Sequence, residues 1–193
     1  MIKFAIVGNI ASGKSTMEKI LEKYGYVVLD TDFMTHDILI DNPEVSKAFS
    51  EYDVFEYGKL SREKLGALVF SDNDLKTKLE EIIHPLIKKE LEMAFETFKN
   101  EPVLFISVPL LFEVGWENMF DKIVFINSED SIRKERLVSL RGYTQEYAQK
   151  RIDSQMSQED KIKKSDYVVQ NNGSIDEYIG NIEQFIKTIQ QNQ

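Results

Sequence analysis

The sequence comprises 193 residues, of which 42% are hydrophobic, and this length and composition predict about one domain with a buried core. The formal net charge of -9 argues against a protein whose main partner is nucleic acid, because such proteins bind by neutralising phosphates with basic residues. The chain has no cysteine, which excludes disulfides and thiolate metal sites. The apolar stretch Phe4–Val7 is too short for a signal peptide, and no segment reaches the ~18 apolar residues of a membrane span. We therefore expect a soluble cytoplasmic protein without a membrane partner.

The first residues have the pattern of a strand, a helix and a second strand. Ile2–Val7 is an apolar run that predicts a buried strand, and the glycine-containing segment Gly8–Thr16 follows it. Apolar residues then recur at helical spacing over Ser15–Gly25, where Gly25 is typical of a helix C-terminus. Tyr26–Asp30 predicts a second buried strand. A strand-helix-strand unit of this kind predicts a parallel sheet with helices on its faces.

Residues 31–100 contain no segment that we expect to form a strand. Three stretches have helical patterns, namely Phe33–Leu39, Ser61–Phe70 and Leu75–Phe98. Pro85 predicts either a kink in the third helix or the start of a helix. A segment of about 70 residues is longer than a simple crossover requires. We therefore expect part of it to form a helical insertion that stands off the sheet.

Three further strands are predicted in the second half of the chain, at Val103–Val108, Lys122–Asn127 and Asp166–Asn171. Ser128 is expected to cap the helix that follows the second of these strands. Further helices are expected to begin at Thr144 and Ser157 and to cover residues 175–189. The whole pattern predicts an α/β protein with a five-stranded parallel sheet.

The segment GNIASGKST, Gly8–Thr16, matches the phosphate-binding pattern G-x-x-x-x-G-K-[S/T]. Gly8 and Gly13 allow the loop to wrap a phosphate with its N–H groups, and the positive end of the next helix adds to the attraction. Lys14 is expected to reach the β- and γ-phosphates, and Ser15 to hold Mg²⁺ through its hydroxyl. The loop residues that we expect to contact ATP are Ala11, Ser12, Gly13, Lys14, Ser15 and Thr16.

The loop pattern alone does not separate a kinase from a switch or a motor. The GTPase motifs D-x-x-G and N-K-x-D do not occur in the sequence, and a motor needs a much longer chain. A small kinase is therefore the simplest interpretation. Besides the phosphate loop, such an enzyme needs a metal site, a group that orients the acceptor hydroxyl, and arginines that neutralise charge during transfer.

Two carboxylates, Asp30 and Asp32, close the second predicted strand. Ligands of open parallel sheets bind outside the carboxyl ends of the strands, so this pair is expected at the site. One carboxylate would hold Mg²⁺ through water, and the other would accept a proton from the acceptor hydroxyl. The alternative is that one of the two caps the next helix.

Four arginines lie in or beside the helices after the fourth predicted strand, namely Arg133, Arg136, Arg141 and Arg151. Arg141–Tyr143 falls between two helices, where a lid would hinge and carry arginines onto the transferring phosphate. The alternative is a solvated face of ion pairs with the many glutamates. Of the two histidines, His36 is expected on the surface and His84, in an apolar helix, has the pattern of a structural residue.

The sequence resembles the dephospho-coenzyme A kinase family over nearly its whole length. The resemblance depends on GNIASGKST at 8–16, VLDTD at 28–32, LSREKL at 60–65, LEEIIHPLI at 79–87, VPLLFE at 108–113, ERLVSLR at 135–141, RIDSQ at 151–155 and SDYVVQNNGS at 165–174. It implies a three-layer α/β/α P-loop fold in one kinase domain, residues 1–193. Its parts are a nucleotide-binding core (about 1–30, 101–135 and 165–193), a helical acceptor-binding insertion (about 31–100) and a helical lid (about 136–164).

The resemblance also implies an activity and its residues. Enzymes of the family use MgATP to phosphorylate the ribose 3′-hydroxyl of dephospho-coenzyme A, the last step of coenzyme A synthesis. Asp32 matches the proposed catalytic base, Arg136 and Arg141 match arginines that contact ATP, and Asn171 matches an asparagine near the adenine. The acceptor-side positions are matched by Arg62, His84, Pro85 and the stretch Pro109–Glu113, with Leu111 and Glu113 the residues that we expect to bind the acceptor. Lys14 and Arg141 join Asp32 as expected catalytic residues, Ser15 and Asp30 are the expected metal ligands, and a monomer or weak homo-oligomer is expected.

The sequence departs from the family pattern at four positions. The family often has T-G-G-I-G-S-G-K-S, whereas Val7, Asn9 and Ala11 stand here in place of a threonine and two glycines. Ser107 stands where an aspartate often precedes V-P-L-L, which weakens the case for a metal-binding carboxylate there and shifts that duty toward Ser15 and Asp30. Two alternatives stay open, namely a kinase with another small acceptor and a nucleotide-sensing module without transfer activity.

Overall fold

The computed structural model describes residues 1–191, except for the side chains of residues 36, 37, 40 and 41. The side chain of His36, expected on the surface, therefore lies outside the described residues. The chain divides into two compact units. The first unit combines Met1–Leu29 with Asn100–Gln193, and the second is Asp30–Lys99.

The first unit is built on a five-stranded sheet with the strand order β2-β5-β1-β6-β7. Its elements are β1 (Ile2–Gly8), α1 (Lys14–Lys23), β2 (Val27–Asp30, whose last residue belongs to the second unit), β5 (Val103–Ser107), the 3-10 helix η1 (Glu117–Met119), β6 (Lys122–Asn127), α6 (Asp130–Arg141), α7 (Gln145–Asp153), α8 (Gln158–Lys163), β7 (Tyr167–Gln170) and α9 (Ile175–Gln191). Strand β1 runs parallel to both of its neighbours, β5 and β6, and β6 runs parallel to β7. The five predicted strands and the parallel sheet are confirmed.

The three central strands are buried on both faces. All residues of β5 are buried, as are the last five residues of β1 and four consecutive residues of β6. Strands that are covered on both faces read as continuous apolar runs rather than as alternating ones, and this is why their sequences predicted them well. The chain leaves the sheet after β1, which is its middle strand. Ligands of open α/β sheets bind outside the carboxyl ends of the strands, so the segment after β1 is placed at such a site.

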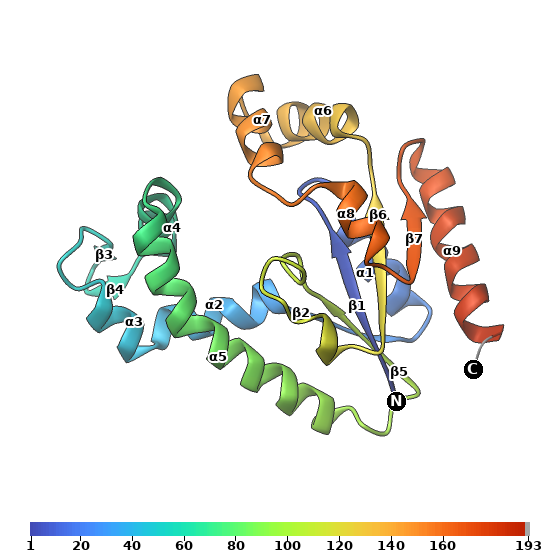
Figure 1. The fold of residues 1–193 in the computed structure, drawn as a ribbon, viewed down its shortest axis with the longest axis horizontal. Helices are drawn as coiled ribbons and strands as arrows, with labels where there is room; N and C mark the ends of the chain where they lie inside the picture. The colour runs from blue at the N-terminus through green and yellow to red at the C-terminus, as the bar shows by residue number, and fades with distance from the viewer. Residues whose placement is uncertain (192–193) are drawn as a thin grey trace. The chain divides into compact units, whose positions relative to one another are not determined.

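Helices α1 and α9 pack against each other and share one core with the sheet (Figure 1). Met17 and Leu21 of α1 are fully buried there, beside Phe185 and its neighbours on α9. Helix α1 ends at Lys23, and the predicted glycine, Gly25, follows the C-cap residue Tyr24 with a φ of 86°, which suits glycine. The Gly25 N–H donates to the Glu22 carbonyl and the Tyr26 N–H donates to the Leu21 carbonyl, a Schellman arrangement that turns the chain into β2.

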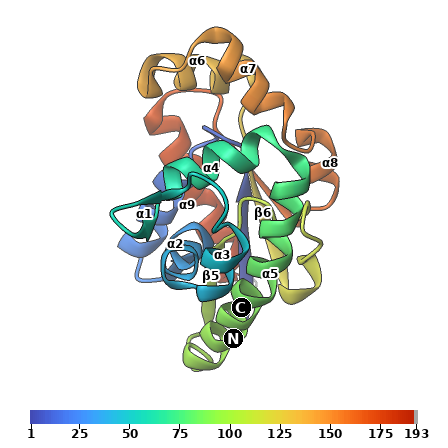
Figure 2. The ribbon, with the colours of Figure 1, turned by 90° about the vertical axis from the view of Figure 1, so that its left-hand side faces the viewer.

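Helices α6 and α7 lie side by side (Figures 1 and 2) and share a small buried cluster of Leu137, Ala148 and Ile152. Thr144 and Ser157 cap α7 and α8 as predicted, since their side chains accept backbone N–H groups. The predicted cap at Ser128 is wrong. Helix α6 begins at Asp130 after an N-cap residue that makes no side-chain cap bond. The Ser128 hydroxyl is fully buried instead and donates to the Asn171 carbonyl at 2.9 Å.

The second unit is mainly helical. Its elements are α2 (Thr31–Asp41), α3 (Pro43–Ala48), β3 (Phe55–Glu56), β4 (Lys59–Leu60), α4 (Arg62–Ser71) and α5 (Asn73–Thr97). The expectation that this segment contains no strand is wrong, because β3 and β4 form an antiparallel hairpin. The hairpin turns at Tyr57 and Gly58, which both have positive φ, as the tightest hairpin turns require. Strands of two residues are too short to show an alternating pattern in a sequence.

Helix α5 is continuous through Pro85. The helix begins after Asp72, whose side chain accepts the N–H groups of Asp74 and Leu75. Pro85 therefore does not mark a helix start, which was one of its two predicted roles. One apolar face of α5 is buried, at Leu79, Ile83, Ile87, Leu91 and Ala94.

Phe105 on β5 provides a test of the core. Its ring is fully buried, and the centroid lies 5.0 Å from that of Phe4 and 5.2 Å from that of Tyr26. Phe105→Ala should lower the free energy of unfolding by about 3–5 kcal/mol, because it removes these contacts and leaves a cavity. Urea denaturation followed by the fluorescence of the single tryptophan, Trp116, measures this. Val168→Ala, at a position of β7 that is 37% exposed, is the control and should cost less than about 1 kcal/mol.

Candidate active site

The glycine loop leaves the sheet at the end of its central strand and leads directly into α1. Gly13 is the N-cap residue of α1 and has a φ of 104°, which favours glycine. A Cβ atom at this position would also overlap the side-chain amide of Asn171 and lie 3.0 Å from the ring of Tyr178. Both the backbone conformation and the available space therefore require a glycine. The first turn of α1 contains no acidic residue, so its N–H groups and dipole favour an anion.

The carbonyl groups of the loop are held by donors from other parts of the first unit. Four consecutive loop carbonyls accept side-chain hydrogen bonds: Ile10 from Arg133 Nη1 at 3.4 Å, Ala11 from Arg136 Nη1 at 3.2 Å, Ser12 from Asn171 Nδ2 at 2.7 Å and Gly13 from the Tyr178 hydroxyl at 3.0 Å. These donors come from α6, from the residue after β7 and from α9. Because each carbonyl is engaged, the peptide planes of the loop are fixed before a ligand binds. Such preorganisation makes loop amides effective for phosphate binding.

A cavity of about 370 Å³ lies beside the loop, within the size range of small-molecule sites. It is lined by all of the residues that were assigned to ATP, namely Ala11, Ser12, Gly13, Lys14, Ser15, Thr16, Arg136, Arg141 and Asn171. It is also lined by four residues that sequence reasoning missed, Leu140, Gly173, Ile175 and Tyr178. Leu140 and Ile175 are 79% and 58% exposed, so the cavity has apolar surface that a nucleotide base could cover. The only sequence signal for Leu140, Gly173 and Ile175 is position, since each lies within four residues of a predicted site residue, and Tyr178 lacks even this signal.

The two arginines of the cavity differ in their surroundings. The Arg136 guanidinium is partly buried and donates to Ala11, to Ser128 Oγ, and to both the carbonyl and the side-chain oxygen of Asn171, at 3.1 to 3.2 Å. Burial lowers the pKa of Arg136 from its usual value. Because the usual pKa of arginine lies far above neutral pH, the side chain stays charged. Arg141, at the end of α6, is exposed. Arg136 thus shapes the loop, whereas Arg141 presents its charge to the cavity.

The other two predicted arginines do not line this cavity. Arg133 is 1% exposed, and its guanidinium lies 2.6 Å from Asp130 and holds the Ile10 carbonyl. Its position contradicts the alternative of a solvated charged face and makes it a support of the loop. Arg151 lies on α7.

Lys14 and Tyr178 also donate hydrogen bonds to carbonyls of the loop. The Lys14 ammonium donates to the Gly8 carbonyl at 3.1 Å, which places its positive charge at the base of the loop. Burial raises the pKa of Tyr178 far above its usual value, so its hydroxyl stays protonated and can donate to Gly13.

Asp30 and Asp32 lie at the start of α2. Asp30 is the N-cap residue, and its Oδ1 accepts the Asp32 N–H at 2.9 Å, so the alternative of a capping aspartate is confirmed for Asp30. Asp32 is exposed in the first turn. Among the described residues no group of three or more acidic or histidine side chains could hold a metal ion. The metal role of Asp30 and the catalytic role of Asp32 stay predictions.

The predicted acceptor residues are divided between the two units. Arg62, His84 and Pro85 belong to the second unit, on α4 and α5. Burial lowers the pKa of His84, although the nearby Glu80 charge opposes this, and His84 is therefore neutral at pH 7. In the first unit, Leu111 is fully buried and Glu113 lies 2.7 Å from the ammonium of Lys161. Their roles in acceptor binding stay predictions.

The hydroxyl of Tyr178 provides a test of the loop supports. Tyr178→Phe should lower the free energy of unfolding by about 1 kcal/mol and weaken ATP binding by about threefold, because the Gly13 carbonyl loses one of its donors. The control is Tyr24→Phe near the same pair of helices, where the exposed hydroxyl donates to Glu183 at 2.9 Å. Urea denaturation and titration calorimetry with ATP measure both quantities. Equal effects of the two substitutions would mean that the Tyr178 hydroxyl does not support the loop.

The chain is similar to known proteins over nearly its whole length. The sequence profile of the family described as Dephospho-CoA kinase matches residues 2–177. The dephospho-CoA kinase of Helicobacter pylori strain ATCC 700392 / 26695 is 35% identical over 189 residues, which are 96% of each chain. The solved structure of the dephospho-CoA kinase from Campylobacter jejuni is similar with a TM-score of 0.77 and 30% identity, covering 99% of this chain and 98% of that one.

More distant structures share the fold alone. A shikimate kinase from Acinetobacter baumannii, solved in complex with shikimate, has a TM-score of 0.58 at 11% identity and covers 100% of this chain and 95% of its own. The predicted α/β fold of the P-loop kinases is thereby confirmed. The family profile spans most of the chain, and the H. pylori relative covers nearly all of it at 35% identity. The chain therefore belongs to the dephospho-CoA kinase family.

Proposed function

We propose that this protein transfers the γ-phosphoryl group of ATP to the ribose 3′-hydroxyl of dephospho-coenzyme A. The family membership supports the reaction and the acceptor. The observation that carries the proposal is the cavity that Lys14, Ser15 and Arg141 line, beside a loop in which four consecutive carbonyls accept side-chain hydrogen bonds. This arrangement suits a triphosphate, because backbone N–H groups, a helix N-terminus and two kinds of cation point to the same place.

In the proposed mechanism the loop amides and Lys14 hold the β- and γ-phosphates. Asp32 orients the acceptor hydroxyl and takes its proton as the hydroxyl oxygen attacks the γ-phosphorus. The bond between the γ-phosphorus and the bridging oxygen breaks, and ADP leaves with the electron pair. Arg136 and Arg141, which both line the cavity, offset the charge on the transferring group.

The residues present fit Mg²⁺ as a partner of ATP. Ser15 lines the cavity and would offer its hydroxyl to the ion, and Asp30, with one oxygen engaged as a helix cap, has a second oxygen that could bind through water. When bound, Mg²⁺ neutralises charge on the β- and γ-phosphates. A site with few protein ligands suits this ion, which keeps several waters and is held largely by substrate phosphates.

We also propose that the protein acts in the cytoplasm as a monomer or weak homo-oligomer, without nucleic-acid partners. The net charge of -9 supports the last point. In the described part of the chain, no helix is long and apolar enough to span a bilayer.

A panel of acceptors tests the proposed reaction. ADP release from MgATP should require dephospho-coenzyme A, and the product should carry its new phosphate on the ribose 3′ oxygen, as phosphorus NMR can show. Shikimate, gluconate and nucleoside monophosphates complete the panel. Turnover with one of these instead would assign a different acceptor, and ATP binding without transfer to any of them would point to a nucleotide sensor.

Replacement of Asp32 tests the proposed base. Asp32→Asn should lower kcat by about 10²–10⁴-fold, because the amide cannot accept the proton, while the affinity for ATP changes less than about twofold. The chain contains a matched control in Asp74→Asn. Asp74 follows the capping Asp72 on α5 in the same way as Asp32 follows Asp30, and its N–H donates to Asp72 at 2.9 Å. If Asp32→Asn turns over as fast as Asp74→Asn, Asp32 is not the base.

A further inference from the structure

We infer that Asn9 and Gln155 are positioning residues that hold the phosphate loop in its binding conformation. Gln155 lies in a linker, residues 154–157, that joins α7 to α8. The inference depends on the proposed function only in that ATP binds at the loop, and it does not depend on the identity of the acceptor.

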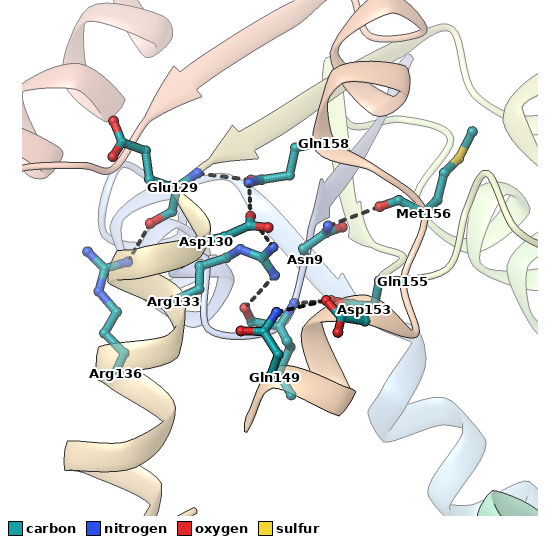
Figure 3. Close-up of polar contacts among 12 residues, drawn as sticks. Asn9, Glu129, Asp130, Arg133, Arg136, Gln149, Asp153, Gln155, Met156 and Gln158 are labelled. Atoms are coloured by element: carbon teal, nitrogen blue, oxygen red, sulfur yellow. Dashed lines mark hydrogen bonds and ion pairs between the residues drawn. The ribbon is translucent and has the colours of Figure 1, made fainter. Parts of the chain in front are cut away.

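The linker makes two hydrogen bonds to the loop (Figure 3). The Ile10 N–H donates to Gln155 Oε1 at 2.7 Å, and Asn9 Nδ2 donates to the Met156 carbonyl at 3.1 Å. Asn9 is only 1% exposed, so the second bond is shielded from water. The contacts span about 145 residues of sequence, and no local pattern in the loop predicts them.

The peptide groups of Ile10 are fixed on both sides. Its N–H is held by Gln155 and its carbonyl by the buried Arg133, which is itself held by Asp130. Figure 3 shows Arg133 between Asp130 and the loop, with Asn9 and Gln155 beside it. The side chains of Ile10 and Ala11 also pack against the cluster between α6 and α7. The orientation of these peptide groups is therefore set by α6, α7 and the linker rather than by the loop itself.

The linker is itself anchored, which allows it to position the loop. The Met156 N–H donates to Glu113 Oε1 at 3.4 Å, and the same oxygen lies 2.7 Å from the ammonium of Lys161 on α8. Lys161 is fully buried, and removal of its partner would leave an unpaired charge in the interior. Glu113 is therefore held in place and in turn holds Met156.

These contacts affect the affinity for ATP, because phosphate binding by a loop depends on where its amide N–H groups point. Without Gln155 the Ile10 N–H would be left without an acceptor, and part of the binding energy would be needed to order the loop. Asn9 acts in the same direction by tying the residue before Ile10 to Met156. It stands where the family often has glycine, which has no side chain that could make this bond.

The test measures ATP affinity in the full chain, with MgATP and no acceptor. Gln155→Met keeps the length of the side chain and removes the acceptor, and the dissociation constant for ATP should rise about tenfold. Gln155→Glu retains an oxygen that can accept the Ile10 N–H and should bind within about threefold of the parent protein. Asn9→Gly should bind about threefold more weakly.

Gln149→Met is the matched control. Gln149 lies on α7, and its side chain donates to Asp153 at 2.8 Å on the same helix rather than to the loop (Figure 3). ATP affinity should be unchanged in this variant. Thermal unfolding of each variant separates the two possible roles, because a merely structural residue would lower the melting temperature and leave the affinity of the folded protein as it was.

Two results would overturn the inference. One is an ATP affinity of Gln155→Met within twofold of that of the parent protein. The other is a loss of ATP affinity in Gln149→Met that equals the loss in Gln155→Met. If Gln155→Met does not fold, the ATP affinities of Asn9→Gly and Gln149→Met are compared instead. Unchanged ATP affinity in Asn9→Gly would then overturn the inference. Loss of ATP affinity in the linker variants supports it even if the acceptor panel identifies another substrate.

Discussion

The site depends on hydrogen bonds from side chains of distant elements to the carbonyls of the phosphate loop. A loop with two glycines has many accessible conformations, and a phosphate would have to select one of them at an entropic cost. Arg133, Arg136, Asn171 and Tyr178 remove much of that freedom by engaging four consecutive carbonyls. The loop is thus ordered by the folding of the whole first unit, and a ligand can bind to it without further rearrangement.

This constraint separates residues that looked equivalent in the sequence. The four arginines after β6 share a charge and a region of the chain, yet Arg133 is buried beneath the loop, Arg136 is bound to it and Arg141 is exposed at the cavity. Ser128 likewise has a role that its residue type did not reveal. It has the residue type of a helix cap, but it lies buried between Arg136 and Asn171, where its hydroxyl can bond to both. For Arg133, Arg136 and Ser128 the deciding factor is burial beside a particular carbonyl.

The proposed chemistry distributes its parts over both units. The phosphate loop and the arginines belong to the first, whereas Asp32, Arg62 and His84 belong to the second. In Asp30 one carboxylate oxygen serves as a helix cap, which fixes the start of α2 and hence the backbone of Asp32. The sequence D-x-D recurs at the start of α5, where the same capping arrangement forms without any proposed catalytic role. A D-x-D pair by itself therefore indicates a helix start, and only its place at the carboxyl end of a strand of the parallel sheet, here β2, predicts a site.

The sequence by itself determined the five strands, the parallel sheet, most helices, the glycine loop and the family. Continuous apolar runs, helical periodicity and an eight-residue motif are local signals, and each is produced by residues that are neighbours in the chain. Only the tertiary structure decided what supports the loop, because Gln155, Asn171 and Tyr178 are more than 140 residues away from the loop atoms that they bind. The two-residue strands of the β3–β4 hairpin were also beyond sequence reasoning, since a strand so short has no period. Local patterns record which element a residue joins, whereas the partner of a buried polar group is set by packing between elements.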